Sequence, residues 1–302
     1  MKIILHSEYL TVEYLIWRMC NFSDSFSEKL EENFYNDMKV IILPVNSRNL
    51  LSKVKIGQKI YIFKQYGKPE PSKFLENESN IYDLNILGNI STEKIFYDHG
   101  YGIIVTEKLL GFDPIMQILY LILPLGNWEK VSNIISLSAS IFRQLHQSKI
   151  DSSLMLKPDS VSILKKVDSH SNQLLIDDIN FFEREWKQED FIHFDLRLDN
   201  MLIKDTEIKI IDWEMAIIGD YYWDLAIFLN SLVLFLGTVE IYTLSTHFRL
   251  ERIRSVVKEF IKTYFSQKED EPDLNKLRVY WRLQNFALYD SEIYINRIND
   301  FL

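Results

Sequence analysis

The sequence predicts an α+β fold, because strand-like and helix-like patterns occupy different parts of the chain. Short apolar runs typical of strands gather between residues 38 and 65. From residue 113 onward, most of the chain places its apolar residues at helical spacing. A length of 302 residues is compatible with two lobes that share one site or with two independent domains.

Composition and charge exclude several classes of protein. The hydrophobic fraction of 47% is enough for a sizeable core, and the charged fraction of 25% is ordinary. The single cysteine excludes an intrachain disulfide and suits a reducing compartment. The net charge of −9 argues against a broad nucleic-acid surface, which needs clustered lysine and arginine. No apolar run is long enough for a signal peptide or a membrane span, so we expect a cytoplasmic protein without a membrane partner.

The N-terminal part of the chain is expected to begin with helices. The stretch Thr11–Cys20 starts with a threonine that can cap a helix and continues with apolar residues at helical spacing. A second, polar helix is expected over residues 24–34. Neither stretch contains a pattern typical of a functional site, so residues 1–37 are predicted to form a helical appendage.

Three strands are expected next, over Val40–Leu43, Leu51–Ile56 and Lys59–Gln65, with a turn at Gly57. Lys64 lies among apolar residues of the third strand, where a buried ammonium group needs a partner. Taken alone, Lys64 is most simply interpreted as an edge-strand lysine whose head reaches solvent.

The remaining elements are predicted to be mainly helical. Helices are expected over Pro71–Leu87, Asp113–Gln147 and Asp168–Lys187, a buried strand over Tyr101–Thr106, and helices again from Tyr221 to Leu302. His146, near the end of one of these helices, is expected to be a packing histidine whose charge is tolerated there.

A predicted hairpin determines the functional interpretation. Asn200 and Asp212 flank two short apolar runs, 201–203 and 208–211, which are joined by a polar connection longer than a minimal turn. A hairpin brings its two ends together, so these side chains are expected to meet, with Asp195 on the preceding loop. Amide and carboxylate oxygens are ligands that Mg²⁺ prefers, and a further carboxylate could orient an attacking hydroxyl.

The same region contains motifs in a fixed order and spacing. They are HFDLRLDN at 193–200, IDWE at 211–214, GD at 219–220 and WDLA at 223–226. This set resembles the aminoglycoside phosphotransferase and choline kinase-like family, distant relatives of protein kinases. The resemblance covers residues 38 to 266 and implies a bilobal protein-kinase-like fold. Residues 38–106 would be a small ATP-binding lobe built on an antiparallel sheet, and residues 107–302 a larger, mostly helical catalytic and acceptor-binding lobe.

The resemblance implies roles for the residues of the larger lobe. Asp195 would be the catalytic base, and Asn200 and Asp212 would be the ligands of Mg²⁺, with Asn200 also part of the catalytic set. Asp224 would hold the catalytic loop from the following helix, and His193 would support that loop.

Arg197 has two interpretations that the sequence leaves equal. Its guanidinium group could neutralise the γ-phosphate as a catalytic residue, or it could pair with Asp199 on the surface.

The resemblance also implies roles for residues of the smaller lobe. Lys64 would contact the α- and β-phosphates of ATP and pair with a glutamate of the next helix. Glu78 is the preferred partner, and Glu76 is the alternative.

A connection within this lobe and the segment that joins the two lobes would also contact the nucleotide. The connection between the first two strands contains no glycine, although glycine normally lets backbone N–H groups approach phosphates closely. Ser47 and Asn49 could contact the phosphates instead. The backbone from Glu107 to Leu109 would hydrogen-bond to the adenine.

The implied reaction is transfer of the γ-phosphoryl group of ATP to a hydroxyl of a small aminoglycoside- or choline-like alcohol. Acidic residues outnumber basic ones between Asp190 and Asp224, which favours a cationic acceptor. A Ser/Thr kinase that acts on a peptide, as a subunit of a lanthipeptide-type modifying system with a protein partner, is one alternative. A non-catalytic nucleotide-binding pseudokinase is another, and the glycine-free loop is its support.

Overall fold

The structure is a computed structural model of the chain. It describes residues 39–42, 49–56, 59–66, 71–84, 87–99, 102–150, 173–239, 246–267, 271–289 and 302. The chain divides into two compact units, Met1–Leu110 and Gly111–Leu302. The helices predicted over 11–20 and 24–34, the turn at Gly57 and the candidate residue Ser47 lie outside the described residues.

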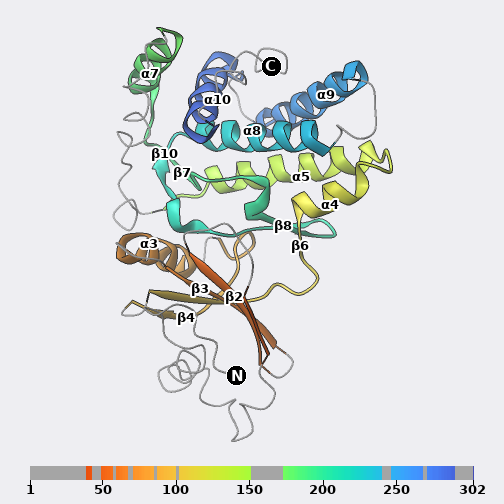
Figure 1. Ribbon diagram of the computed structural model, residues 1–302. Coiled ribbons are helices and arrows are strands. Elements are labelled where there is room, and N and C mark those ends of the chain that lie inside the picture. The colour runs from red at the N-terminus through yellow and green to blue at the C-terminus, as the bar shows by residue number, and fades with distance from the viewer. Residues whose placement is uncertain are drawn as a thin grey trace, which may run out of the picture. The chain divides into compact units, whose positions relative to one another are not determined.

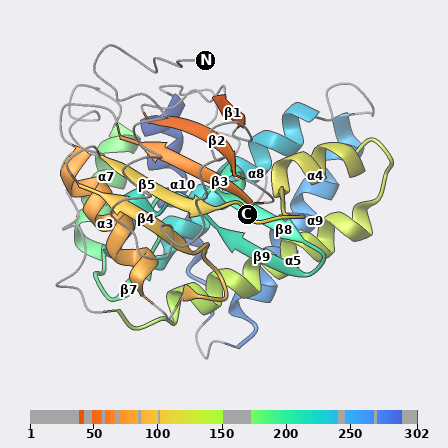
Figure 2. The same ribbon diagram turned by 90° about the horizontal axis from the view of Figure 1, so that it is seen from below.

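The first unit is built on a five-stranded antiparallel sheet, whose strands lie in the order β1-β2-β3-β5-β4 (Figure 2). The strands are β1 (Lys39–Ile42), β2 (Leu50–Ile56), β3 (Lys59–Gln65), β4 (Lys94–Asp98) and β5 (Ile103–Glu107). Because β3 is the central strand, Lys64 is not on a sheet edge, and the edge-strand interpretation is wrong. Lys64 pairs in register with Leu51 on one side and Ile104 on the other.

The helix α3 (Pro71–Asp83) packs against β4 and β5. Its first residue is Pro71, whose fixed φ suits the first position of a helix. The helix ends four residues before the predicted limit, because the Leu84 N–H donates to the carbonyl of Ile81 and tightens the last turn. Leu75 of α3 forms a buried apolar cluster with Tyr66 and Ile104.

The second unit is mostly helical. Its helices are α4 (Ile115–Ile122), α5 (Trp128–His146), α7 (Gln173–Glu185), α8 (Tyr221–Val239), α9 (Thr246–Phe265) and α10 (Leu274–Tyr289). Helix α5 packs against α9. Helix α10 packs against both α8 and α7 (Figure 1). Among the residues that the structure describes, none of the helices has the length and apolar character that crossing a membrane requires.

The segment 113–147, predicted to be helical, is not helical throughout. The segment contains the short strand β6 (Asp113–Pro114) and two separate helices, α4 and α5. Gly126 adopts a left-handed conformation with φ +66°, which ends the preceding turn. Asn127 then caps α5, because its side chain accepts the N–H of Lys130 at 3.1 Å.

The predicted hairpin is present as β8 (Met201–Lys204) and β9 (Glu207–Ile210), and β6 pairs with the outer side of β8. Its turn is shorter than predicted, because Lys204 pairs directly with Glu207. Asp205 in this two-residue turn has φ 52°, a conformation that aspartate tolerates better than most residues.

A second pair of strands, β7 (Asp190–Ile192) and β10 (Ile217–Gly219), brackets the hairpin and was not predicted. Gly219 is required where the two strands meet Trp186. A Cβ atom at Gly219 would lie 2.6 Å from Cδ1 of Ile192 and 2.9 Å from Cζ2 of Trp186. The close approach explains why glycine stands directly before Asp220.

Candidate active site

The open end of the β8–β9 hairpin brings three predicted site residues together. Met201 pairs with Ile210, and the Ile211 N–H donates to the carbonyl of Asn200 at 3.0 Å. Asn200, at the end of the 3₁₀ helix η4 (Leu198–Asn200), therefore lies beside the segment that leads into Asp212. Its Nδ2 donates to the backbone carbonyl of Asp195 at 2.8 Å and is 3.4 Å from the Asp195 carboxylate.

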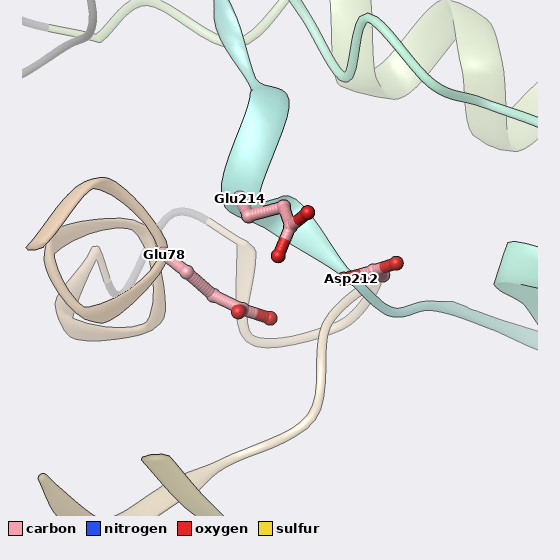
Figure 3. Close-up of side chains that lie close together, drawn as sticks. All are labelled: Glu78, Asp212 and Glu214. Carbon is pink, nitrogen blue, oxygen red and sulfur yellow. The ribbon is translucent and has the colours of Figure 1, made fainter. Parts of the chain in front are cut away.

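Asp212 and Glu214 stand at the start of the 3₁₀ helix η5 (Trp213–Met215), on the segment that follows β9 (Figure 3). Asp212 has a left-handed backbone, with φ 68° and ψ 55°, and such backbone strain occurs most often at functional sites. A carboxylate oxygen of Asp212 and one of Glu214 lie within 4.8 Å of each other.

The donor set of this segment fits a hard divalent cation. Because Nδ2 of Asn200 is engaged by Asp195, Oδ1 is the atom that Asn200 can offer as a ligand. Together with the Asp212 carboxylate it supplies oxygen donors only, as Mg²⁺ requires. Glu214, which belongs to the IDWE motif but for which no role was predicted, adds a buried carboxylate to this set.

Asp195 is in contact with a guanidinium group. Nε of Arg197 lies 3.0 Å from Oδ1 of Asp195, and Nη2 of Arg197 lies 3.5 Å from Oδ2 of Asp199. Burial raises the pKa of Asp195 above its ordinary value, while the charge of Arg197 opposes that shift. Arg197 therefore pairs with Asp199, as one of its two interpretations predicted. It also pairs with Asp195, which was not predicted.

The loop before Asp195 is attached to the first turn of α8. The carboxylate of Asp224, which is fully buried, accepts the N–H of His193 at 2.7 Å and the N–H of Phe194 at 2.8 Å. The indole N–H of Trp223 donates to the carbonyl of Phe194 at 3.2 Å. Asp224 therefore holds the loop from the following helix, as the family resemblance predicted.

Phe194 is held in an unfavourable conformation. Its φ of 70° lies in the left-handed region, which a bulky residue rarely adopts. The ring of Phe194 stacks on that of Trp223, with centroids 5.3 Å apart and planes at 14°. This stacking and the two bonds to its backbone offset the strain, so the direction in which the chain enters Asp195 is set by α8.

His193 supports the loop from its other side. Its side chain is buried, and Nε2 lies 3.0 Å from the carbonyl oxygen of Ile211. This bond joins the loop to the residue immediately before Asp212. The supporting role predicted for His193 agrees with this contact.

His146 belongs to the same network. Its Nε2 lies 3.2 Å from Oδ2 of Asp224, and its Nδ1 lies 2.8 Å from the hydroxyl of Tyr264 on α9. His146 is 5% exposed, so it is a buried packing residue as predicted. The contact with Asp224 was not predicted, because the two residues are far apart in the sequence.

Ser231, a further residue of α8, also contributes to the site, and this role was not predicted from the sequence. Its Oγ accepts the N–H of Leu198 at 3.3 Å and donates to the carbonyl of Phe228 at 2.8 Å. The helix η4 has no side-chain cap of its own from Arg197. Ser231 therefore caps η4 from outside by accepting the N–H of Leu198, which lies two residues before Asn200. Nothing in the local sequence indicates this contact.

The first unit contains the predicted lysine–glutamate pair. Nζ of Lys64 lies 2.7 Å from Oε2 of Glu78, and both residues are buried. Glu78 comes from the middle of α3 (Figure 3). Glu76 instead pairs with His99 at an exposed position, with 2.9 Å between Oε1 and Nε2. Of the two candidate glutamates, Glu78 is the one that meets Lys64.

The remaining candidates of the first unit lie at strand ends. Asn49 is buried immediately before β2. Glu107 is the last residue of β5, and its carboxylate pairs with Nζ of Lys59 at 3.0 Å. The Lys108 N–H donates to the carbonyl of Ile60 at 2.7 Å. Leu109, which follows, is half-buried.

Residues 165–254 match the model of the phosphotransferase enzyme family. This segment includes the loop of Asp195, the β8–β9 hairpin, the whole of α8 and the start of α9. None of the curated proteins matches the chain.

Solved structures of kinases resemble the chain over most of its length. Choline kinase LicA from Streptococcus pneumoniae is 18% identical, with 87% of this chain and 85% of that chain covered and a TM-score of 0.57. Amicoumacin kinase hAmiN, in complex with AMP-PNP, Ca²⁺ and Ami, is 13% identical, with 97% and 92% covered and a TM-score of 0.61. Aminoglycoside-3'-phosphotransferase of type VIII is 16% identical, with 82% and 93% covered and a TM-score of 0.57.

These comparisons confirm the predicted resemblance to the aminoglycoside phosphotransferase and choline kinase-like family and the protein-kinase-like α+β fold. The prediction of a phosphotransferase enzyme is confirmed by the family match. At these identities the solved structures establish the fold.

Proposed function

We propose that the protein transfers the γ-phosphoryl group of ATP to a hydroxyl of a small, cationic, aminoglycoside- or choline-like alcohol. The observation that supports this most is the hydrogen bonding of Asn200 to Asp195 at the open end of the hairpin that leads into Asp212. It groups a candidate base with two candidate metal ligands in the segment that matches the phosphotransferase family.

Asn200 and Asp212 are proposed to bind Mg²⁺ through Oδ1 and a carboxylate oxygen, with Glu214 as a further candidate ligand. The bound Mg·ATP supplies the phosphoryl group and the charge neutralisation that its transfer needs. Asp195 accepts the hydrogen bond of the acceptor hydroxyl and orients its oxygen. Arg197, which contacts Asp195 and Asp199, is proposed to place its positive charge near the transferring phosphate.

We propose that the nucleotide binds to residues 38–106 and to the segment that directly follows them. Lys64, held by Glu78, would contact the α- and β-phosphates, and Ser47 and Asn49 would contribute polar groups to the phosphates. The backbone from Glu107 to Leu109 would bind the adenine. Residues 107–302 would then contain the catalytic residues and the acceptor site.

The charge of the catalytic segment supports a cationic acceptor. Acidic residues outnumber basic ones between Asp190 and Asp224, and part of the excess remains after the proposed metal ligands are set aside. The structural neighbours include a choline kinase and an aminoglycoside phosphotransferase, and both choline and aminoglycosides are cationic alcohols.

The proposal is tested by incubating the protein with Mg·ATP and a panel of acceptors, and by detecting phosphate monoesters with ³¹P NMR. Choline, ethanolamine, aminoglycosides and a neutral polyol would form the panel, together with a Ser/Thr peptide. We expect the wild type to form a phosphate monoester with a cationic alcohol. The variant Asp195→Ala should form no product. Phosphorylation of the peptide alone would contradict the small-molecule proposal and favour the peptide-kinase alternative.

A further inference from the structure

The carboxylate of Glu78 binds more than the ammonium group of Lys64. The hydroxyl of Tyr66 donates to Oε2, the oxygen that Lys64 contacts, and the hydroxyl of Tyr82 donates to Oε1 at 2.9 Å. Both oxygens of the carboxylate are therefore engaged by side chains of the first unit. Glu78 is only 1% exposed, so these donors take the place that water has at the surface.

A buried ion pair needs such additional donors. Removing two charges from water costs more than their attraction returns, unless further hydrogen bonds satisfy the remaining lone pairs. Lys64 is 9% exposed, and its Nζ lies 4.8 Å from the ring centroid of Tyr66. Tyr66 thus stabilises both members of the pair, the carboxylate through its hydroxyl and the ammonium group through its ring.

Each tyrosine is fixed by the element from which it comes. Tyr66 follows β3 two residues after Lys64, which places it on the same face of the extended chain. Its N–H donates to the carbonyl of Gly102 at 2.8 Å, and its ring is buried against Leu75 and Ile104. Tyr82 lies one helical turn after Glu78 in α3. Glu78 is therefore held from the strand and from its own helix.

A second contact fixes α3 on the sheet. Nζ of Lys94 in β4 lies 2.6 Å from Oδ2 of Asp83 and donates to both Oγ and the carbonyl of Ser79, at 2.8 and 3.2 Å. A rotation of α3 that separated Lys64 from Glu78 would disrupt these bonds together with those of the tyrosines.

We propose that Tyr66 and Tyr82 are positioning residues that keep the Lys64–Glu78 pair formed and thereby fix Lys64 for the phosphates of the nucleotide. This inference rests on the proposed function, because it assumes that Lys64 binds phosphate. Neither tyrosine belongs to the motifs that indicated the family, and their hydroxyls do not touch the reacting atoms.

The test compares the binding of Mg·ATP with that of adenosine, which has no phosphates, by calorimetry on the full chain. The variants are Tyr66→Phe and Tyr82→Phe, with Lys64→Ala as the reference and Tyr97→Phe as the matched control. Tyr97 packs against the same buried cluster from β4, and its substitution leaves the Glu78 contacts intact.

We expect Tyr66→Phe to weaken Mg·ATP binding about tenfold, the value of one hydrogen bond to a charged group. Tyr82 is half-exposed, so water replaces part of its contact, and Tyr82→Phe should weaken binding about threefold. Both variants and Tyr97→Phe should bind adenosine like the wild type. A damaged fold would instead weaken adenosine and Mg·ATP together.

The inference is overturned if Tyr66→Phe binds Mg·ATP like the wild type while Lys64→Ala binds it more weakly. It is also overturned if Tyr66→Phe weakens adenosine as much as Mg·ATP. A wild-type protein that binds no nucleotide, or a Lys64→Ala variant with unchanged affinity for Mg·ATP, would remove the proposed role of Lys64 as well.

Discussion

Asp224 holds the backbone of Phe194 in a left-handed conformation by accepting its N–H group at 2.8 Å. The same carboxylate accepts the His193 N–H at 2.7 Å, so the loop before Asp195 is attached to α8 at two consecutive residues. Asp224 is fully buried, and its charge is satisfied by these donors and by His146. The geometry of the candidate base therefore depends on a residue that does not touch the reacting groups.

Asp224→Asn should lower kcat about 100-fold or more and reduce the free energy of unfolding by about 1–3 kcal/mol. The amide retains only one acceptor oxygen and turns its NH₂ group toward a buried backbone donor. Steady-state kinetics and urea denaturation would measure the two effects. Asp178→Asn is the control, because it destabilises a buried contact with Arg282 on α10, away from the loop. Equal loss of stability with equal loss of activity in both variants would contradict a loop-positioning role.

Ser231→Ala should reduce turnover about three- to tenfold, because η4 then loses the acceptor for the Leu198 N–H and Asn200 is less well positioned. The loss should be larger at low Mg²⁺ concentration, and Ser231→Thr, which retains a hydroxyl, should restore activity. Ser140→Ala is the matched control, because Ser140 makes a similar bond to the carbonyl of Ser136 within α5. Kinetics against Mg²⁺ concentration would decide, and identical curves for both alanine variants would rule out the positioning role.

Gly219→Ala should destabilise the second unit by about 1–3 kcal/mol, because the new Cβ would overlap the side chain of Ile192. Gly237→Ala should instead stabilise the second unit. Gly237 lies within α8 and a Cβ there meets nothing within 4 Å, so alanine should stabilise the helix by about 0.5–1 kcal/mol. Chemical denaturation of the two variants beside the wild type measures both changes. Stabilisation by Gly219→Ala would show that the β7–β10 pair can open without cost.

Sequence patterns predicted the parts of the site that are formed by residues close together in the chain. The spacing of Asp195, Asn200 and Asp212 predicted their convergence, because a hairpin between the last two leaves few other arrangements. The strand Lys59–Gln65 was predicted with its correct limits, since its apolar run is bounded by turn residues.

Other features depend on contacts that no local pattern indicates. The strands β7 and β10 have three residues each, too few to show a period. In β4 only Asp98 is buried, so the alternation that identifies a strand is weak. Ser231 and His146 act across the fold on Leu198 and Asp224. Their roles follow from the packing of α5 and α8 around the loop rather than from the residues beside them.

Calorimetric titration of ATP into the wild type, Asp212→Ala and Asp195→Ala, each with and without Mg²⁺, separates metal binding by Asp212 from the action of Asp195 on the acceptor. If Asp212 binds the metal of Mg·ATP and Asp195 acts on the acceptor, wild-type binding should require Mg²⁺. Binding should then weaken at least about thirtyfold in Asp212→Ala and stay near the wild-type value in Asp195→Ala, which should show no turnover. Equal, Mg²⁺-independent binding in all three proteins, or no binding by the wild type, would show that Asp212 and Asp195 do not have these roles.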